Sequence, residues 1–288
     1  MNRQFSVLPR DAIVNLRASK IREVANAGMG RSDTLAFWFG EPDEVTPDFI
    51  RAAATESLAR GETFYSHNLG LPELRQTVAN YLSALHPNPA APIRADNIAI
   101  TSAGVNALSL AAQCIVNAGD RVVCVTPLWP NLVEIPKILS ANVECVALDF
   151  TANGWQLDLD KLLAALTPET TMLMVNSPNN PTGWTLSREE QKAILARCRE
   201  YGIWLLADDA YERLVFDGTG CAPSFFDIAD AQDRLVSANT FSKSWLMTGW
   251  RLGWLVAPAP FIEQLGKVIE YNTSCAPVFV QRAGDVAI

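Results

Sequence analysis

Short apolar runs rich in β-branched residues alternate with helical patterns from about residue 96 onward. The apolar runs cover residues 98–101, 122–125, 143–148, 171–175, 203–207, 235–238 and 252–256. Helical patterns lie between several of them, at 103–116, 159–166 and 187–201. Almost continuously apolar strands are typical of a sheet that is covered by helices on both faces. The sequence therefore predicts an α/β fold with a mostly parallel seven-stranded sheet.

The part of the chain before this alternation has a different pattern. Residues 10–27 predict an amphipathic helix, 34–39 a short extended run and 40–43 a turn. Residues 47–60 and 72–85 predict two more helices, the first with Thr46 as its N-cap. A last helix begins near Val280, and the helix at 187–201 opens with the capping box Ser187 and Glu190.

Charge and composition exclude several classes of function. A net charge of −8 and a pI near 4.9 argue against nucleic acid and anionic membranes as partners. No apolar run is long enough to span a bilayer, and the first residues lack the apolar stretch of a signal peptide. The six cysteines form no C-x-x-C pair, which favours free thiols in a reducing compartment. We therefore expect a cytoplasmic protein, and the two histidines, His67 and His86, predict no metal site.

Residues that can take part in catalysis or ligand binding follow five of the predicted strands, at the point where each strand ends. In open α/β sheets, ligands bind at the carboxyl ends of the strands. Five separate segments are therefore expected to meet at one crevice. The residues in question are Ala103 and Gly104 after the first strand, Trp129 after the second, Asn180 after the fourth, Asp208 after the fifth and Lys243 after the sixth.

The segment Thr240-Phe241-Ser242-Lys243, followed by Arg251 between Gly249 and Gly253, is the most specific motif of the chain. A lysine amine can form an imine with an aldehyde. The hydroxyls and the guanidinium can hold a phosphate, and the glycines permit close approach of the backbone. A solvated surface lysine is the simpler interpretation of Lys243, but it leaves this long pattern unexplained. The motif resembles the lysine signature of the class I/II aminotransferases, which use pyridoxal phosphate.

The resemblance implies roles for the polar residues at the sheet edge. Lys243 forms the Schiff base with pyridoxal phosphate and carries the proton, while Asp208 pairs with the ring nitrogen. Asn180, in Ser-Pro-Asn-Asn-Pro-Thr-Gly, and Tyr211 contact the phenolic oxygen. Asp209 competes with Asp208 for its role. Tyr211 can instead be an aromatic that only packs, and the Asn180 segment is also a turn.

The resemblance also implies how the rest of the cofactor is held. The phosphate lies at the start of a helix, bound by backbone N–H groups and by nearby side chains. Trp129 stacks on the ring, and Tyr65 reaches the phosphate of a neighbouring subunit, which implies a homodimer with shared sites. Gly40 contacts the substrate carboxylate. The phosphate ligands are Ala103, Gly104, Val105, Thr240, Ser242 and Arg251.

Three of these residues have simpler interpretations. Ser242 can be a turn cap, Trp129 a core residue and Gly40 a turn glycine.

The chain departs from the family pattern in length. Family members continue into a C-terminal small domain, whose arginine binds the substrate carboxylate. We therefore expect residues 1–45 to be part of a small domain, residues 46–288 to form the cofactor-binding large domain and the C-terminal small domain to be missing. Arg282 is a poor substitute for the missing arginine.

The leading hypothesis is a transaminase that moves an amino group between an L-amino acid and a 2-oxo acid. Val105 stands where some members carry a lysine for a distal carboxylate, which favours neutral or aromatic amino acids. The same fold also hosts carbon–sulfur lyases and cyclising synthases, so these are alternatives. A truncated protein that binds pyridoxal phosphate without turnover is a third hypothesis.

Overall fold

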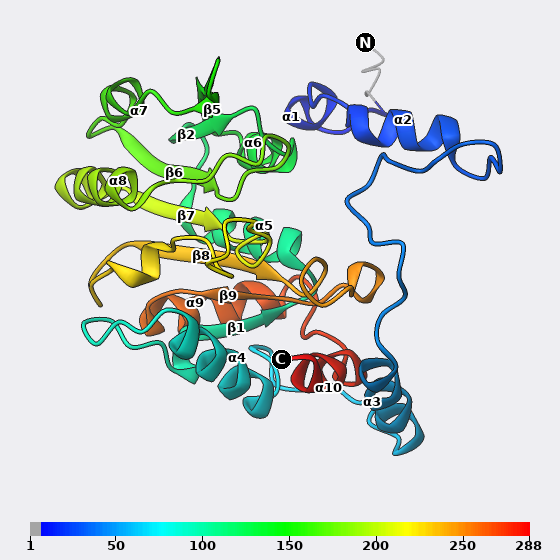
Figure 1. Cartoon of the computed structure of the whole chain (residues 1–288). Coiled ribbons are helices and arrows are strands. Elements are labelled where there is room, and N and C mark those ends of the chain that lie inside the picture. The colour runs from blue at the N-terminus through cyan, green and yellow to red at the C-terminus, as the bar shows by residue number, and fades with distance from the viewer. Residues whose placement is uncertain (1–6) are drawn as a thin grey trace, which may run out of the picture.

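A computed structural model describes residues 7–288, and its central element is a seven-stranded sheet (Figure 1). The strands in chain order are β1 (Ile98–Thr101), β2 (Arg121–Thr126), β3 (Asn142–Ala147), β6 (Thr170–Asn176), β7 (Trp204–Asp208), β8 (Leu235–Thr240) and β9 (Gly253–Val256). Their order in space is β1, β9, β8, β7, β6, β2, β3. All neighbours from β3 to β8 pair in parallel, and β9 is antiparallel to both β1 and β8. The predicted mostly parallel seven-stranded sheet is confirmed.

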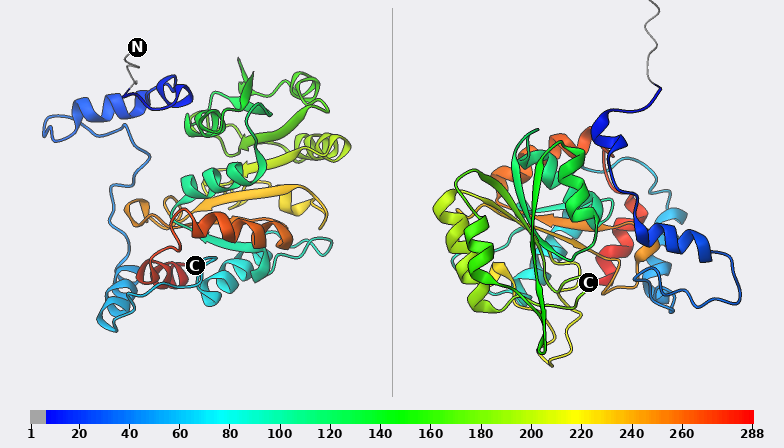
Figure 2. Two further views of the ribbon diagram at one scale, coloured as in Figure 1. Left: turned by 180° about the vertical axis from the view of Figure 1, so that it is seen from behind. Right: turned by 90° about the horizontal axis from the view of Figure 1, so that it is seen from above.

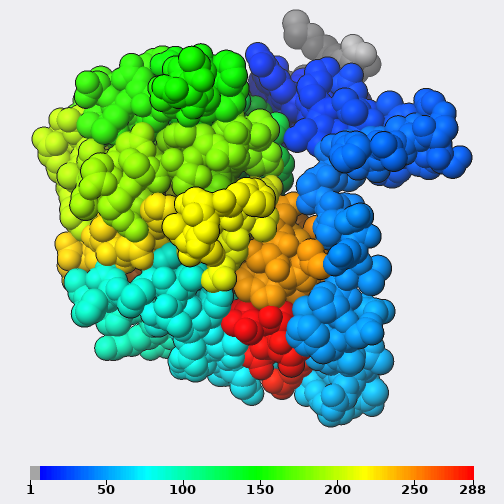
Figure 3. Space-filling model, in the orientation of Figure 1, coloured from blue at the N-terminus to red at the C-terminus, as the bar shows by residue number. Residues whose placement is uncertain are grey.

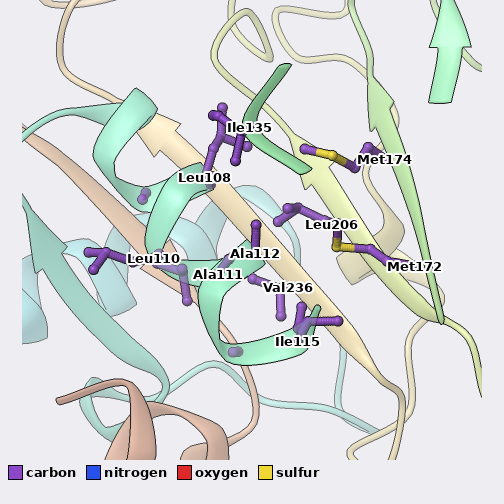
Figure 4. Packing of buried hydrophobic residues seen from close by; sticks show 14 of the residues in the cluster. Leu108, Leu110, Ala111, Ala112, Ile115, Ile135, Met172, Met174, Leu206 and Val236 are labelled. Atoms are coloured by element: carbon purple, nitrogen blue, oxygen red, sulfur yellow. The ribbon is translucent and has the colours of Figure 1, made fainter. Parts of the chain in front are cut away.

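Helices cover both faces of this sheet (Figure 2). In β6, Met172 and Met174 point to one face while Leu173 and Val175 point to the other, as the period of two in a strand requires. The first face packs against α5 (Gly104–Ile115), α6 (Asn131–Ile138) and α9 (Ala259–Glu270). Figure 4 shows Leu108 and other α5 side chains against this face.

The second face packs against helices from several parts of the chain. Two of them, α7 (Leu159–Ala165) and α8 (Arg188–Tyr201), cover the β2, β6 and β7 half of the sheet. Near β1 and β9 the same face packs against α4 (Pro72–Leu85) and α10 (Val278–Ala287), and α10 also contacts α3 (Asp48–Ala59). Short 3-10 helices are η1 (Ala95–Asn97), η2 (Phe225–Asp227) and η3 (Thr248–Trp250). The helices predicted at 47–60, 72–85, 103–116, 159–166 and 187–201 are confirmed within two residues at each end.

A small hairpin was missed in the sequence analysis. Strands β4 (Asp149–Thr151) and β5 (Gly154–Gln156) form a separate two-stranded antiparallel sheet. The dipeptide Asn153-Gly154 at its turn is the strongest short-range signal for a hairpin. This signal was overlooked because both strands are only three residues long.

The prediction of one helix over residues 10–27 was wrong. The structure has two helices, α1 (Asp11–Val14) and α2 (Lys20–Gly28). Ser19 begins the second helix, because its hydroxyl accepts a hydrogen bond from the backbone N–H of Arg22 at 3.3 Å. The extended run expected at 34–39 contains no strand, and the turn expected at 40–43 has only a bend at its end.

Thr46 was also predicted wrongly, because Pro47 is the N-cap of α3. The Thr46 hydroxyl donates instead to the carbonyl of Leu246 at 2.6 Å and accepts from the indole N–H of Trp250 at 2.9 Å. These two bonds tie the start of α3 to the loop that follows β8. The helix predicted to begin near Val280 is α10, which begins at Val278.

The helices α1 and α2 form an arm that lies apart from most of the body (Figures 1 and 3). Residues 29–47 contain no helix or strand and connect this arm to α3. The guanidinium of Arg10 contacts the end of α6, where it donates to the Ser140 hydroxyl at 3.3 Å and to the carbonyl of Ile138.

None of the helices in residues 7–288 combines the length and the apolar character needed to cross a membrane.

Candidate active site

The carboxyl ends of the strands bring the predicted residues to one edge of the sheet. Because β1, β2, β6, β7 and β8 run in the same direction, the segments that follow them start at the same edge. These segments hold Ala103 and Gly104 after β1, Trp129 after β2, Asn180 after β6, Asp208 at the end of β7, and Lys243 after β8.

Lys243 lies between the N-terminal segment and the loop after β7. Its Nζ donates to the carbonyl of Gly40 at 2.6 Å and lies 5.8 Å from the centre of the Tyr211 ring. Burial lowers the pKa of Lys243 and the charge of Arg251 lowers it further, against the opposing charges of Glu41 and Asp208. The environment therefore makes the neutral amine, which is the nucleophilic form, more accessible.

Asn180 and Tyr211 form a direct hydrogen bond, in which the Asn180 side-chain amide donates to the Tyr211 hydroxyl at 3.2 Å. Asn176, the last residue of β6, holds this pair in place. Its side-chain oxygen accepts from the backbone N–H of Asn180 at 2.7 Å, and its amide donates to the carbonyl of Asp208 at 3.0 Å. Asn176 was not singled out in the sequence analysis. A polar residue at the end of an otherwise buried apolar strand was the available signal.

Asp208 is a buried carboxylate with few partners. It is 5% exposed, and within residues 7–288 its side chain accepts one hydrogen bond, from the backbone N–H of Ala210 at 3.2 Å. Burial raises the pKa of Asp208 to about 6, although the Ala210 N–H and the charge of Lys243 oppose this shift. A buried carboxylate in this condition is stabilised by an N–H donor or by a cation.

Asp209, the competitor for this role, points in another direction. Its carboxylate accepts a hydrogen bond from the Ser237 hydroxyl at 2.5 Å, inside β8. Burial and the neighbouring charge of Glu212 raise the pKa of Asp209 to about 7. The two adjacent aspartates therefore face different surroundings, and only Asp208 lies near Lys243.

The start of α5 and the end of β8 approach each other closely. A Cβ at Gly104 would lie 3.0 Å from the Cβ of Thr240, so glycine is needed for this approach. Ala103, the N-cap of α5, has a φ of 109°, a strained conformation that costs a non-glycine residue about 1–3 kcal/mol. The first backbone N–H groups of α5, including that of Val105, have no partner within the helix and favour an anion.

Two buried hydroxyls lie beside this helix start. Thr240 donates to the Ser242 hydroxyl at 2.9 Å, and the backbone N–H of Ser242 donates to Thr240 Oγ1 at 3.1 Å. Arg251 is exposed at the end of η3 with a φ of 56°, and its guanidinium donates to the carbonyl of Thr248 at 2.6 Å. A cavity of about 760 Å³ opens beside Arg251 and Ser102.

Two predicted site residues are not joined to this cluster. Trp129 is half-buried after β2 and packs against the core under α5 and α6. Tyr65 is 88% exposed, and no hydrogen bond or ring contact in residues 7–288 connects it to the other site residues. Its neighbour Phe64 is also exposed. A Tyr65 role in the same subunit therefore has no support from the geometry.

The profile of the family described as aminotransferase class I and II matches residues 35–286. The chain is 33% identical over 278 residues to an aspartate aminotransferase of Pyrococcus horikoshii, which covers 96% of this chain and 69% of that protein. It is also 33% identical over 280 residues to a probable N-acetyl-LL-diaminopimelate aminotransferase of Bacillus subtilis, covering 95% and 67%. The chain belongs to the class I and II aminotransferases.

The solved structures agree with this membership. A single mutant of the Thermus thermophilus aspartate aminotransferase has a TM-score of 0.87 at 27% identity, covering 97% of this chain and 72% of that one. This aminotransferase therefore depends on pyridoxal phosphate and transfers an amino group between an amino acid and a 2-oxo acid. The predicted family, cofactor and reaction are confirmed, and nothing in these similarities favours a lyase or a cyclising synthase.

The residues of this aminotransferase fit the cofactor. Asp208 is a buried acceptor that needs an N–H donor, and the pyridinium of pyridoxal phosphate provides one. The close approach of Gly104 to Thr240 forms a cradle with N–H and O–H donors for a phosphate. Lys243 has a depressed pKa, as an amine that bonds to an aldehyde requires.

Proposed function

We propose that Lys243 holds pyridoxal phosphate covalently through its amine and that Asp208 pairs with the ring nitrogen. Pyridoxal phosphate, when bound, supplies an aldehyde carbon and an electron-accepting ring. The observation that carries this proposal is the buried carboxylate of Asp208, which has one hydrogen bond in residues 7–288 and lies near Lys243. The cluster of groups around it has the composition that this cofactor needs.

Lys243 also moves the proton in this proposal. Once the substrate amine has replaced it, the free Nζ would take a proton from the substrate α-carbon and would later give that proton back. Burial and the charge of Arg251, which lower the pKa of Lys243, support this role. The bond from Nζ to the carbonyl of Gly40 holds the amine at the edge of the N-terminal segment.

Asn180 and Tyr211 orient the ring in this proposal. The Asn180 amide and the Tyr211 hydroxyl lie 3.2 Å apart, so both can donate to one oxygen that lies beside the pair. The phosphate is held by the N–H groups of Ala103, Gly104 and Val105, and by Thr240, Ser242 and Arg251. Trp129 lies on the segment after β2 at the same edge, where we propose that it stacks on the ring.

We further propose that two copies of the chain form a homodimer with shared active sites. Tyr65 and Phe64 are exposed aromatic side chains outside the cluster of their own subunit. Tyr65 would bind the phosphate held by the second copy. Mixing a Lys243→Ala chain with a Tyr65→Ala chain should restore activity through one site per mixed dimer, because that site combines Lys243 of one copy with Tyr65 of the other, whereas a monomer would show no restoration.

Substrate preference and domain organisation follow as further parts of this proposal. Gly40 would contact the substrate carboxylate next to Lys243, and Val105 would favour neutral or aromatic amino acids over acidic ones. Residues 1–45, of which 1–6 lie outside the described residues, would belong to a small domain, and 46–288 would form the large domain. The separate position of α1 and α2 supports this division (Figure 1). The six free cysteines support a reducing, cytoplasmic location.

Borohydride trapping tests the central proposal. The protein is saturated with pyridoxal phosphate, reduced with sodium borohydride, digested and mapped by mass spectrometry. We expect a pyridoxyl group on the peptide that contains Lys243 and none on the same peptide of Lys243→Ala. An adduct on another lysine, or none on cofactor-loaded protein, would refute the assignment.

A further inference from the structure

A second group of ionisable side chains is buried directly behind the proposed site. The segment after β7 is two-sided, because Asp208 and Tyr211 face the site while Asp209 and Glu212 face the protein interior. Glu212 is 5% exposed and His86, which it contacts, is 3% exposed. The roles proposed above use neither residue. No group of three or more His, Cys, Asp or Glu side chains in residues 7–288 is arranged to hold a metal ion.

His86 is the centre of this buried group. It is the C-cap residue of α4, a position at which the helix dipole favours a cation. Its Nδ1 lies 2.9 Å from the Asp227 carboxylate in η2, and its Nε2 lies 3.6 Å from the Glu212 carboxylate. Burial by itself lowers the pKa of His86, but the bonds to Asp227, Cys221 and Glu212 raise it to about 11. The contacts with two carboxylates therefore favour the imidazolium form of His86.

Glu212 connects His86 to β8 through a hydrogen bond. Its carboxylate accepts from the side-chain amide of Asn239 at 2.8 Å. The side-chain oxygen of Asn239 then accepts from the backbone N–H of Thr240 at 2.7 Å. Thr240 is the residue whose Cβ lies close to Gly104 in the proposed phosphate cradle. One chain of contacts thus joins His86 to Thr240, and all of its members are buried.

Charged and titratable groups from each of the elements that pack around them face His86 and Glu212. Asp227 is also bound by Arg188 at the start of α8. Burial alone would raise the pKa of Asp227, but His86, Ser224 and Arg188 outweigh burial and lower this pKa to about 2. The remaining groups that face the cluster are Asp209, Tyr81, Arg213 and Cys221. An imidazolium is therefore the cation that Glu212 contacts in this cluster.

We propose that His86 is a positioning residue for the cofactor site, because its charge holds Glu212 in the geometry that orients Asn239 and Thr240. Glu212 also follows Tyr211 directly in the chain, so the same contact holds the segment that carries Asp208 and Tyr211. Without the imidazolium, the buried Glu212 carboxylate has lost its cation and moves toward water. This movement changes the bond to Asn239. The proposal depends on the site roles given above.

Substitution of His86 with a matched rescue tests this inference. His86→Phe keeps a planar ring and removes both contacts. We expect its dissociation constant for pyridoxal phosphate to rise, and kcat/KM to fall, by about tenfold to a hundredfold, as small displacements at a reacting site do. Glu212→Gln removes the buried charge but keeps an oxygen that accepts from Asn239. We therefore expect the double variant His86→Phe/Glu212→Gln to return to within about threefold of Glu212→Gln alone.

The readouts separate positioning from simple loss of stability. Cofactor affinity, kcat and KM, and the pH midpoint of the visible cofactor band are measured alongside the thermal midpoint. Asp233→Asn breaks a partly buried ion pair with Arg199 that lies away from the site, and it serves as the control for a loss of stability. If His86→Phe does not fold, His86→Gln replaces it, because one amide can still donate to one of the two carboxylates.

Each outcome decides the inference. A weaker cofactor affinity and a shifted pH midpoint in the His86 variant, rescued by Glu212→Gln and absent from Asp233→Asn, support it. Unchanged affinity and an unchanged pH midpoint despite lower stability, or failure of Glu212→Gln to rescue, overturn it. Wild-type protein that is not labelled at Lys243 by borohydride would refute the site roles instead, so the two failures are distinguishable.

Discussion

At the amino end of β8, two charged side chains are paired with each other, whereas at the carboxyl end of β7 the buried Asp208 carboxylate has few partners. Before β8, Arg199 binds both carboxylate oxygens of Asp233, at 2.7 and 2.6 Å. After β7, the buried Asp208 side chain has one hydrogen bond in residues 7–288. Because unpaired buried groups cost free energy, their concentration at one end marks the place where a ligand completes the bonding.

The backbone conformation also differs between the two ends of the strands. Among residues 7–288, five non-glycine residues have a positive φ, and Ala103, Leu246 and Arg251 lie around the proposed site. Strain of this kind is retained where surrounding structure enforces it, often at functional sites. We therefore propose that the amino ends serve stability and that the carboxyl ends serve ligand binding. Substitutions at the two ends should separate these effects.

The largest effect should come from Lys243, at the carboxyl end. Lys243→Ala removes both the covalent attachment and the proton carrier, so we expect transamination to fall by about 10⁴-fold or more. Lys243→Arg is the matched control, because it keeps a cation beside Tyr211 but cannot give up a proton at neutral pH. Both variants should be equally inactive in a coupled assay, with thermal midpoints close to wild type. Substantial activity in the arginine variant would contradict the role of the amine.

The next effect should come from the choice between two adjacent aspartates. Asp208→Asn cannot keep the ring nitrogen protonated, so we expect kcat/KM to fall by about 10²- to 10³-fold. Asp209→Asn is the matched control and should stay within about threefold of wild type, since it resembles the protonated Asp209. Steady-state kinetics of both variants would decide between them. The reverse order of effects would assign the ring nitrogen to Asp209.

Much of this arrangement was predictable from the chain, for identifiable reasons. All seven strands of the sheet were located because their apolar runs are bounded by polar segments, and the edge that carries Lys243 and Asp208 followed from the parallel direction of the strands. The roles of these two residues came from motif resemblance and remain predictions.

Other features depend on contacts between distant segments and could not be predicted. His86 meets Asp227 across 141 residues, and no local pattern indicates that pairing. The hydroxyl of Thr46 looked like a helix cap but bonds to Leu246, 200 residues further along. The break between α1 and α2 was predictable, because Ser19 is a good N-cap residue, and it was overlooked.

A smaller effect, on stability alone, is expected at the amino ends of the strands. Asp233→Asn leaves Arg199 without its carboxylate, and we expect a loss of about 2 kcal/mol in the free energy of unfolding, less than for a fully buried pair because Arg199 is partly exposed. Urea unfolding would measure this loss. The kcat and KM at 25 °C should match wild type, and a parallel loss of activity would contradict the division between the two ends.

The smallest effect is the pH dependence contributed by Asp209. Burial first, and then the charge of Glu212, raise its pKa to about 7 in the folded protein, from 3.8. The folded state therefore binds more protons than the unfolded state between these values, so Asp209 makes the protein less stable as the pH rises from about 4 through about 7. Asp209→Asn removes this titration. We expect the variant to gain on the order of 1 kcal/mol over wild type at about pH 8, and the gain to decline toward about pH 4. Urea unfolding across this range would measure it, with Asp233→Asn as a control variant that keeps Asp209 and its titration. A difference between Asp209→Asn and wild type that stays constant with pH would show that the pKa of Asp209 is the same in the folded and unfolded states.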